Sequence, residues 1–174
     1  MATLSTNPVN KSFLSNNKFD FVLDRIPNLT FFVQSATLPG LTLQSTSVNN
    51  PYVNLQVPGN QITFNSLSLS FMVDEEMRSW YEIYDWIVQL GNPQSFDKRG
   101  RFFDEPKTDQ LLSVVSDATL FIKTNSNNPR YKVNFTGLFP TDLGEIPFST
   151  TDTQEFVTCS ATFNYTYYTF EAVT

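Results

Sequence analysis

The side chains of this chain that could perform chemistry are few, and nearly all of them are carboxylates. The 174 residues contain no histidine and one cysteine, Cys159. Without histidine, Ser-His and Cys-His nucleophilic catalysis are excluded, and the commonest metal ligand is missing. A single cysteine can neither form an internal disulfide nor build a zinc site without histidine. Carboxylates are therefore the one remaining route to catalysis or metal binding.

Two groups of carboxylates are candidates for a catalytic or metal-binding site. Asp74-Glu75-Glu76 could act as an acid pair or a calcium site, but they stand where a helical pattern begins. Asp is a good N-cap, and the helix dipole favours acids in the first turn, so we interpret them as a helix start. Asp104-Glu105 lies in a charged, irregular stretch over residues 92–110, which indicates a solvated or inter-subunit salt-bridging loop. We expect no enzyme, and no catalytic, cofactor-binding or metal-binding residue.

One clear helix is predicted, from Asp74 to Leu90. Trp80, Ile83 and Ile87 recur at helical spacing and form an apolar face, and Gly91 follows as a stop signal. Trp80 and Trp86 are interpreted as core residues of this helix. An aromatic platform for a sugar is the alternative for the two tryptophans.

The remaining segments show the patterns of strands and turns. A turn is predicted at Pro58-Gly59-Asn60, and a phase shift between Phe64 and Leu67 indicates a β-bulge. The order of elements predicts a mainly β fold, an antiparallel β-sandwich or barrel with one packed α-helix (about residues 74–90). Residues 1–17 are expected to form an N-terminal arm, and residues 18–174 a single domain. The predicted strands cover residues 19–23, 30–37, 41–48, 52–57, 62–73, 114–122, 131–139 and 157–167.

The charge balance argues against a protein that grips nucleic acid. Eleven basic residues stand against seventeen acidic ones, for a net charge of −6. A protein that grips a duplex needs clustered Lys and Arg. No apolar run is long enough to span a bilayer, and the N-terminus lacks a signal peptide pattern. We expect that the protein has no membrane anchor and that it assembles inside a cell.

The most unusual feature is a long segment without charge. From Ile26 to Val73 there is no Lys, Arg, Asp or Glu. Monomeric β proteins usually protect strand edges with charge. An uncharged segment of this length is therefore expected to be covered by neighbouring copies. Residues 41–62 would form a hairpin for assembly, and its candidate contacts are Leu43, Val48, Tyr52, Val53 and Leu55.

Three motifs, in a fixed order over roughly residues 18–170, connect the chain to a known family. The stretch 31–40 ends in Ala-Thr-Leu-Pro-Gly, and a strand ending Phe-Met-Val-Asp-Glu at 71–75 leads into the helix that carries Trp86. Residues 137–145 read Gly-Leu-Phe-Pro-Thr-Asp-Leu-Gly-Glu, ahead of an aromatic final strand. With these motifs the chain resembles the tail tube proteins of contractile-tailed bacteriophages. Related subunits form the tubes of type VI secretion systems.

The resemblance implies a structural subunit of the virion tail. In the family, hexameric rings stack into a tube inside a contractile sheath, and DNA passes through without sequence-specific binding. The implied partners are further copies of the chain, the sheath protein, the baseplate initiator and the tape-measure protein, with assembly in the host cytoplasm. No long extension follows Phe170, which favours the repeating tube subunit. A baseplate or tail-end ring of the same fold, and a carbohydrate-binding β-sandwich module, are the alternatives.

Overall fold

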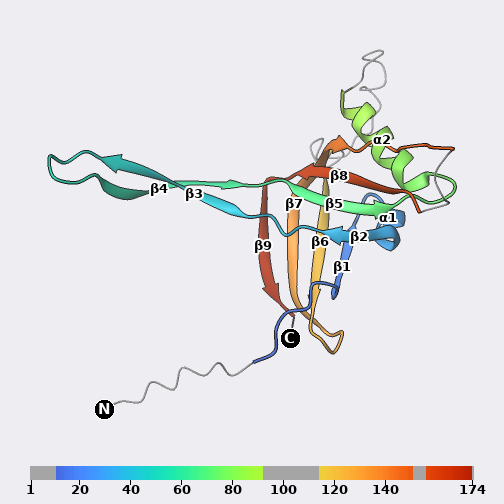
Figure 1. The fold of residues 1–174 in the computed structure, drawn as a ribbon, viewed down its shortest axis with the longest axis horizontal. Coiled ribbons are helices and arrows are strands. Elements are labelled where there is room, and N and C mark those ends of the chain that lie inside the picture. The colour runs from blue at the N-terminus through green and yellow to red at the C-terminus, as the bar shows by residue number, and fades with distance from the viewer. Residues whose placement is uncertain (1–10, 92–113, 151–155, 174) are drawn as a thin grey trace, which may run out of the picture.

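The computed structural model describes residues 11–91, 114–150 and 156–173 (Figure 1). Their architecture is mainly β, with antiparallel strands and one long helix, as the sequence predicts. The elements in chain order are β1 (Phe19–Leu23), α1 (Pro27–Phe32), β2 (Val33–Ala36), β3 (Leu41–Val48), β4 (Leu55–Phe64), β5 (Leu67–Met72), α2 (Arg78–Gly91), β6 (Ser116–Lys123), β7 (Pro129–Leu143), β8 (Thr158–Asn164) and β9 (Tyr167–Ala172).

Strand β7 is shared by the two halves of the main sheet. Its residues 131–136 pair with β9 on one side, and β6 pairs on the other side and leads to β1. Its residues 139–143 pair with β8, which leads through β5 to β2. Gly137 lies between the two stretches at φ +68, where a Cβ would approach Thr166 Oγ1 to 2.8 Å. This left-handed backbone, which glycine adopts freely, allows β7 to change partners.

The core fills the space between the two half-sheets and beneath α2. Ile83 and Trp86 of α2 are fully buried, and the Trp86 ring lies 6.4 Å from that of Phe163. The indole Nε1 of Trp86 donates a hydrogen bond to the carbonyl of Val114 at 3.1 Å. The prediction of Trp86 as a core residue is confirmed. Trp80 is partly buried and stacks on Tyr84 at 5.4 Å.

Helix α2 begins at Arg78 rather than at the predicted Asp74. Met77 has φ +53, so the chain makes a turn before the helix begins. Asp74 still caps the helix, because its carboxylate accepts hydrogen bonds from the backbone N–H groups of Arg78 and Ser79 at 3.2 Å each. Glu75 lies in the turn, outside the helix.

Part of the predicted strand 30–37 is helical instead. Pro27 occupies the first turn of α1, where proline fits, and Leu29 is buried against the core. The strand is therefore limited to β2, whose pairing with β5 contains a bulge.

Three further predictions about the strands differ from the structure. The predicted turn at Pro58-Gly59-Asn60 is wrong, because β4 continues through it. The predicted bulge near Phe64 is a full break between β4 and β5, which belong to different sheets. The predicted final strand 157–167 is two strands, since β8 ends at Asn164 and β9 starts at Tyr167. Apolar and polar residues alternate without interruption from Val157 to Tyr167, which concealed the break between β8 and β9.

The described part of the N-terminal segment lies against the turn between β6 and β7. Ser15 Oγ donates to Asn125 Oδ1 at 2.6 Å, and Asn125 Nδ2 donates to the carbonyl of Phe13 at 3.3 Å. Phe13 itself is 91% exposed. The boundary of an arm over residues 1–17 stays a prediction, and Asp104-Glu105 lies outside the described residues.

Candidate assembly surface

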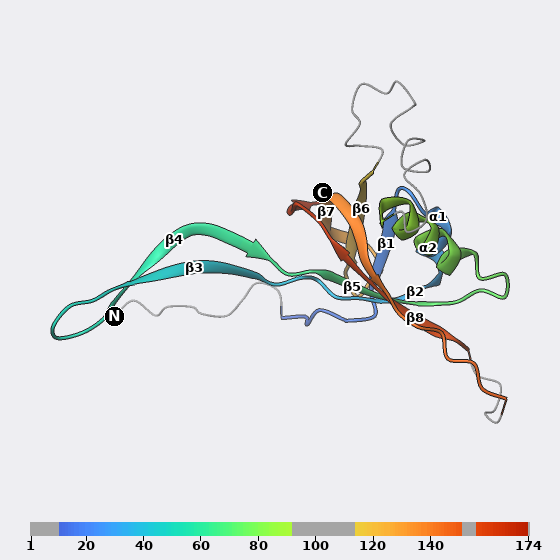
Figure 2. The same ribbon diagram turned by 90° about the horizontal axis from the view of Figure 1, so that it is seen from above.

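The most prominent surface is the β3–β4 hairpin, which projects from the body (Figures 1 and 2). In the described residues these two strands pair with each other and with no other strand. All five contact residues predicted from the sequence lie on this hairpin with exposed side chains. The exposed apolar residues of the hairpin are Leu41, Leu43, Val48, Tyr52, Val53, Leu55, Val57 and Ile62.

The strand register distributes these apolar residues over both faces of the hairpin. Leu43 pairs with Ile62, and two residues further along β3, Ser45 pairs with Pro58 across a bulge in β4. Gly59 is required there, because a Cβ would lie 2.7 Å from the carbonyl oxygen of Gln44. Paired residues share a face and successive residues alternate. The base patch (Leu41, Leu43, Ile62) therefore lies on one face, and the tip patch (Val48, Leu55, Val57) lies on the other.

An aromatic cluster fixes the hairpin to the body. Phe64, on the same face as the base patch, lies 5.3 Å from the ring of Tyr168 and 6.1 Å from that of Tyr165. The hydroxyl of Tyr165 donates to the carbonyl of Asn65 at 2.7 Å, and that of Tyr168 donates to the carbonyl of Pro39 at 3.1 Å. The two tyrosines thus hold the chain at the base of the hairpin, just before β3 begins and just after β4 ends. Sequence reasoning placed Tyr165 in a strand but missed this role.

Burial, and then the neighbouring Tyr168, raise the pKa of Tyr165 to about 12. The unfolded chain ionises at the ordinary tyrosine pKa of about 10. Because the folded pKa is the higher one, this contribution to stability is complete below pH 10 and is lost as the pH rises from 10 to 12.

We expect Tyr165→Phe to flatten this alkaline loss, because phenylalanine cannot ionise. At pH 7 it should cost about 1 kcal/mol for the lost hydrogen bond to Asn65. Urea unfolding at pH 7, 10, 11 and 12 measures both effects. Tyr52→Phe, at a 95% exposed site, is the control and should follow the wild-type profile. A Tyr165→Phe profile identical to wild type would contradict the assignment.

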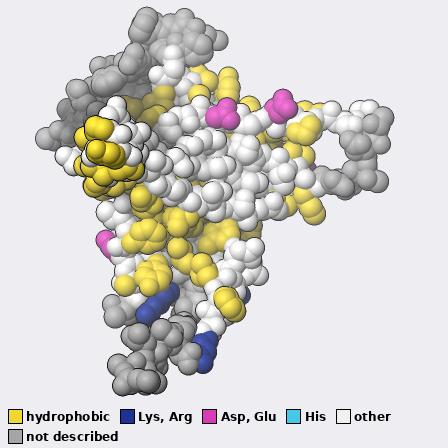
Figure 3. All heavy atoms as spheres, turned by 60° about the vertical axis from the view of Figure 1, so that its left-hand side comes forward, with side chains coloured by type: hydrophobic (Ala, Val, Ile, Leu, Met, Phe, Trp, Pro, Cys, Tyr) yellow, Lys and Arg dark blue, Asp and Glu magenta, His cyan; other side chains and the backbone are white. Residues whose placement is uncertain are grey.

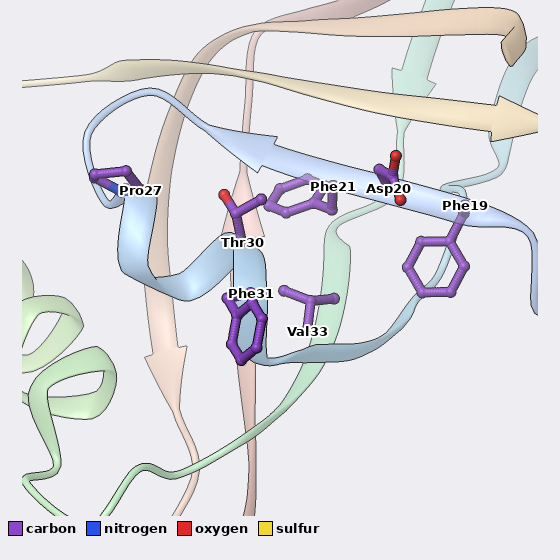
Figure 4. Close-up of a pocket in the computed structure, with 7 residues that line it drawn as sticks. All are labelled: Phe19, Asp20, Phe21, Pro27, Thr30, Phe31 and Val33. Atoms are coloured by element: carbon purple, nitrogen blue, oxygen red, sulfur yellow. The ribbon is translucent and has the colours of Figure 1, made fainter.

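A shallow cavity lies at the opposite edge of the fold, beside β1 (Figure 4). Its volume is about 430 Å³, and its lining is mostly apolar. The one carboxylate, Asp20, is paired with Lys123. Phe31 borders the cavity and is 85% exposed. The lining residues are Phe19, Asp20, Phe21, Pro27, Thr30, Phe31 and Val33.

Several of the charged side chains that the structure describes form ion pairs. Lys132 lies 3.7 Å from Glu171, and Arg78 pairs with Glu76. Among residues 11–91, 114–150 and 156–173, no three metal-type side chains come together. Over the same residues, no helix is both long and apolar enough to cross a membrane. The hairpin is the main candidate for contacts with other proteins, because many of its exposed side chains are apolar and it carries no charge.

Comparison with known proteins places this geometry in a family. The sequence matches the model of the phage tail tube protein family over residues 3–171. It is 31% identical over 147 residues to the tail tube terminator protein of Enterobacteria phage T4, covering 82% of this chain and 78% of that protein.

Two solved structures have a similar fold. One is from the sheath–tube complex of an extracellular contractile injection system, PVC, in the extended state; its TM-score is 0.64 at 14% identity, covering 94% of each chain. The other is the tube-terminating cap of the anti-feeding prophage, with TM-score 0.64 at 14% identity, covering 99% of this chain and 100% of that one. At such identity the likeness shows the tube-like fold alone. With the family match and the T4 relative, the chain belongs to the phage tail tube protein family, a family of structural virion-tail proteins rather than enzymes.

Proposed function

We propose that the protein is a tail tube terminator, a ring that ends the tail tube of a phage. The observation that carries this is the 31% identity to the T4 tail tube terminator protein over most of both chains. The sequence alone favoured the repeating tube subunit and kept a baseplate or tail-end ring of the same fold as the alternative.

In this proposal six copies surround a channel, and the β3–β4 hairpin contacts the last ring of the tube. The hairpin suits this role because it projects, is apolar and carries no charge. DNA passes through without sequence-specific binding, and the net charge of −6 opposes retention of a polyanion. Sheath protein, baseplate initiator and tape-measure protein are the further partners, and the tail assembles in the host cytoplasm.

A repeating tube subunit is the second candidate, favoured by the match to the tail tube family model. Negative-stain imaging of the purified protein distinguishes the two. Single rings that bind to the end of preformed tail tubes support the terminator. Long tubes formed by the protein alone would support the repeating subunit, and rings found at the baseplate end of the virion would contradict both.

Val53→Lys should abolish the binding of rings to tube ends. Val53 is 59% exposed in the hairpin loop, so the change leaves the folded chain intact. In the assembled state it would bury an unpaired charge, which costs several kcal/mol and weakens binding by at least about a hundredfold. Counting capped tube ends by electron microscopy measures this.

Tyr81→Lys is the matched control, because Tyr81 is equally exposed, at 60%, but lies on α2 away from the hairpin. It should cap tubes at the wild-type level. Normal capping by Val53→Lys would remove the hairpin tip from the proposed contact.

A further inference from the structure

We propose that the base of the hairpin and the edge strand β9 form a corner that receives Phe31 of a neighbouring copy, so that copies join head to tail. The inference rests on the ring of the proposed function and adds the contact that closes it.

One wall of the corner is the base patch, and the other is β9. Tyr168 and Phe170 of β9 are paired with Phe135 and Val133, so they lie on the core-facing side of the half-sheet. Phe135 and Val133 are fully buried, yet Phe170 is 53% exposed. An apolar side chain on the core face is thus left uncovered by the described chain.

The corner is continuous and uncharged. Phe64 joins the two walls, because it shares a face with the base patch and contacts Tyr168, whose ring lies 5.7 Å from that of Phe170. The charged residue of β9, Glu171, points to the other face, where it pairs with Lys132. Figure 3 shows hydrophobic side chains gathered below the projecting hairpin on this side of the molecule.

The complementary surface lies at the opposite edge of the same half-sheet. Its strand order runs β9, β7, β6, β1, so β9 and β1 are the two edges (Figure 1). Phe31 projects beside β1, with its ring held edge-on to Phe32 at 5.2 Å and 87°. Thr30 Oγ1, in the adjacent cavity, is buried without a hydrogen-bond partner among the described residues. An interface at this edge would cover the ring and the cavity together.

A second copy is the occupant that satisfies both surfaces at once. A projecting apolar ring on one edge and an apolar corner on the other are different surfaces of one chain, so their contact is heterologous. Such contacts form a ring when the rotation between neighbouring copies closes, as the proposed function requires. Phe31 and the base patch both lie in the uncharged segment from Ile26 to Val73, and the one carboxylate of the cavity, Asp20, is already paired with Lys123. The tip patch faces away from the corner and stays available for the tube.

Crosslinking tests this contact in assembled rings. Two double variants, Phe31→Cys with Leu43→Cys and Phe31→Cys with Phe170→Cys, place thiols on both surfaces. A short bis-maleimide should then link neighbouring copies into a ladder that ends at the closed ring. Phe31→Cys with Tyr52→Cys is the control and should give no ladder, and neither should wild type, whose Cys159 is buried. Mass photometry establishes beforehand that each variant forms rings.

Ring-forming variants that give no ladder from either corner pair would overturn the inference and leave the proposed ring intact. A ladder from the Tyr52 pair alone would also overturn it. Wild-type protein that forms no ring, alone or with tail tubes, would overturn the proposed function and this contact with it. Phe31→Asp supplies an independent check, because it should retain the wild-type melting temperature while the fraction of chain in rings falls at least about tenfold.

Discussion

Trp86→Ala is expected to lower the free energy of unfolding by about 3–5 kcal/mol. That is a large part of the 5–15 kcal/mol typical of a whole domain. The indole is 1% exposed and joins α2 to β8 through its contact with Phe163. Alanine would leave a cavity, and the carbonyl of Val114 would lose its hydrogen bond from Nε1.

The stacking of Arg25 on this indole adds to the expected loss. Its guanidinium carbon lies 4.8 Å from the ring centroid, and burial lowers the pKa of Arg25, against the opposing effect of Asp85. Removing the ring would abolish this cation–π contact, and such a contact contributes about 0.5–2 kcal/mol.

Urea unfolding followed by circular dichroism at pH 7 measures the effect. Tyr81→Ala is the control, since it removes a 60% exposed ring from the same helix and should change stability by less than about 0.5 kcal/mol. A loss below about 1 kcal/mol for Trp86→Ala would show that the indole is not a core residue. That result would restore the alternative of a surface platform for a sugar.

The sequence predicted the elements whose side-chain pattern is local. The apolar face of α2 was visible because helical spacing places Ile83 and Ile87 on one side regardless of tertiary context. The break between Asn164 and Tyr167 was not visible, because both strands alternate alike and only their partners differ. Partners are set by contacts between distant segments, which a local pattern does not encode.

The candidate surface shows the same division. The missing charge located the hairpin, and every predicted contact residue lies on it. Its division into a base patch and a tip patch follows from the register of β3 and β4, which the sequence did not show because it indicated a turn where β4 continues. Phe31 was missed as a candidate contact because it was assigned to a strand, and Phe170 because its exposure depends on β9 being an edge.

Amide exchange of the hairpin should differ sharply between the isolated chain and the assembled ring. A two-stranded sheet alone is at best marginally stable in water, and β3 and β4 have no further strand among the described residues. In the monomer their amides should therefore exchange orders of magnitude faster than those of β5 and β8. The residues nearest Phe64 should exchange more slowly than the tip, because the aromatic cluster anchors that end.

Assembly into rings should raise the protection of the base of the hairpin by at least about a hundredfold, because a neighbouring copy would cover residues that the monomer leaves exposed. Exchange measured by mass spectrometry on wild-type rings and on Phe31→Asp monomers makes the comparison at equal concentration, and β5 serves as the internal reference. A hairpin as protected as β5 in the monomer would contradict the prediction. It would mean that the strands are rigid without neighbours, and the missing charge would then have to be explained by something other than coverage in the ring. In rings without tubes, protection should rise at the base and not at the tip, and added tail tubes should then protect the tip, because the two patches lie on opposite faces.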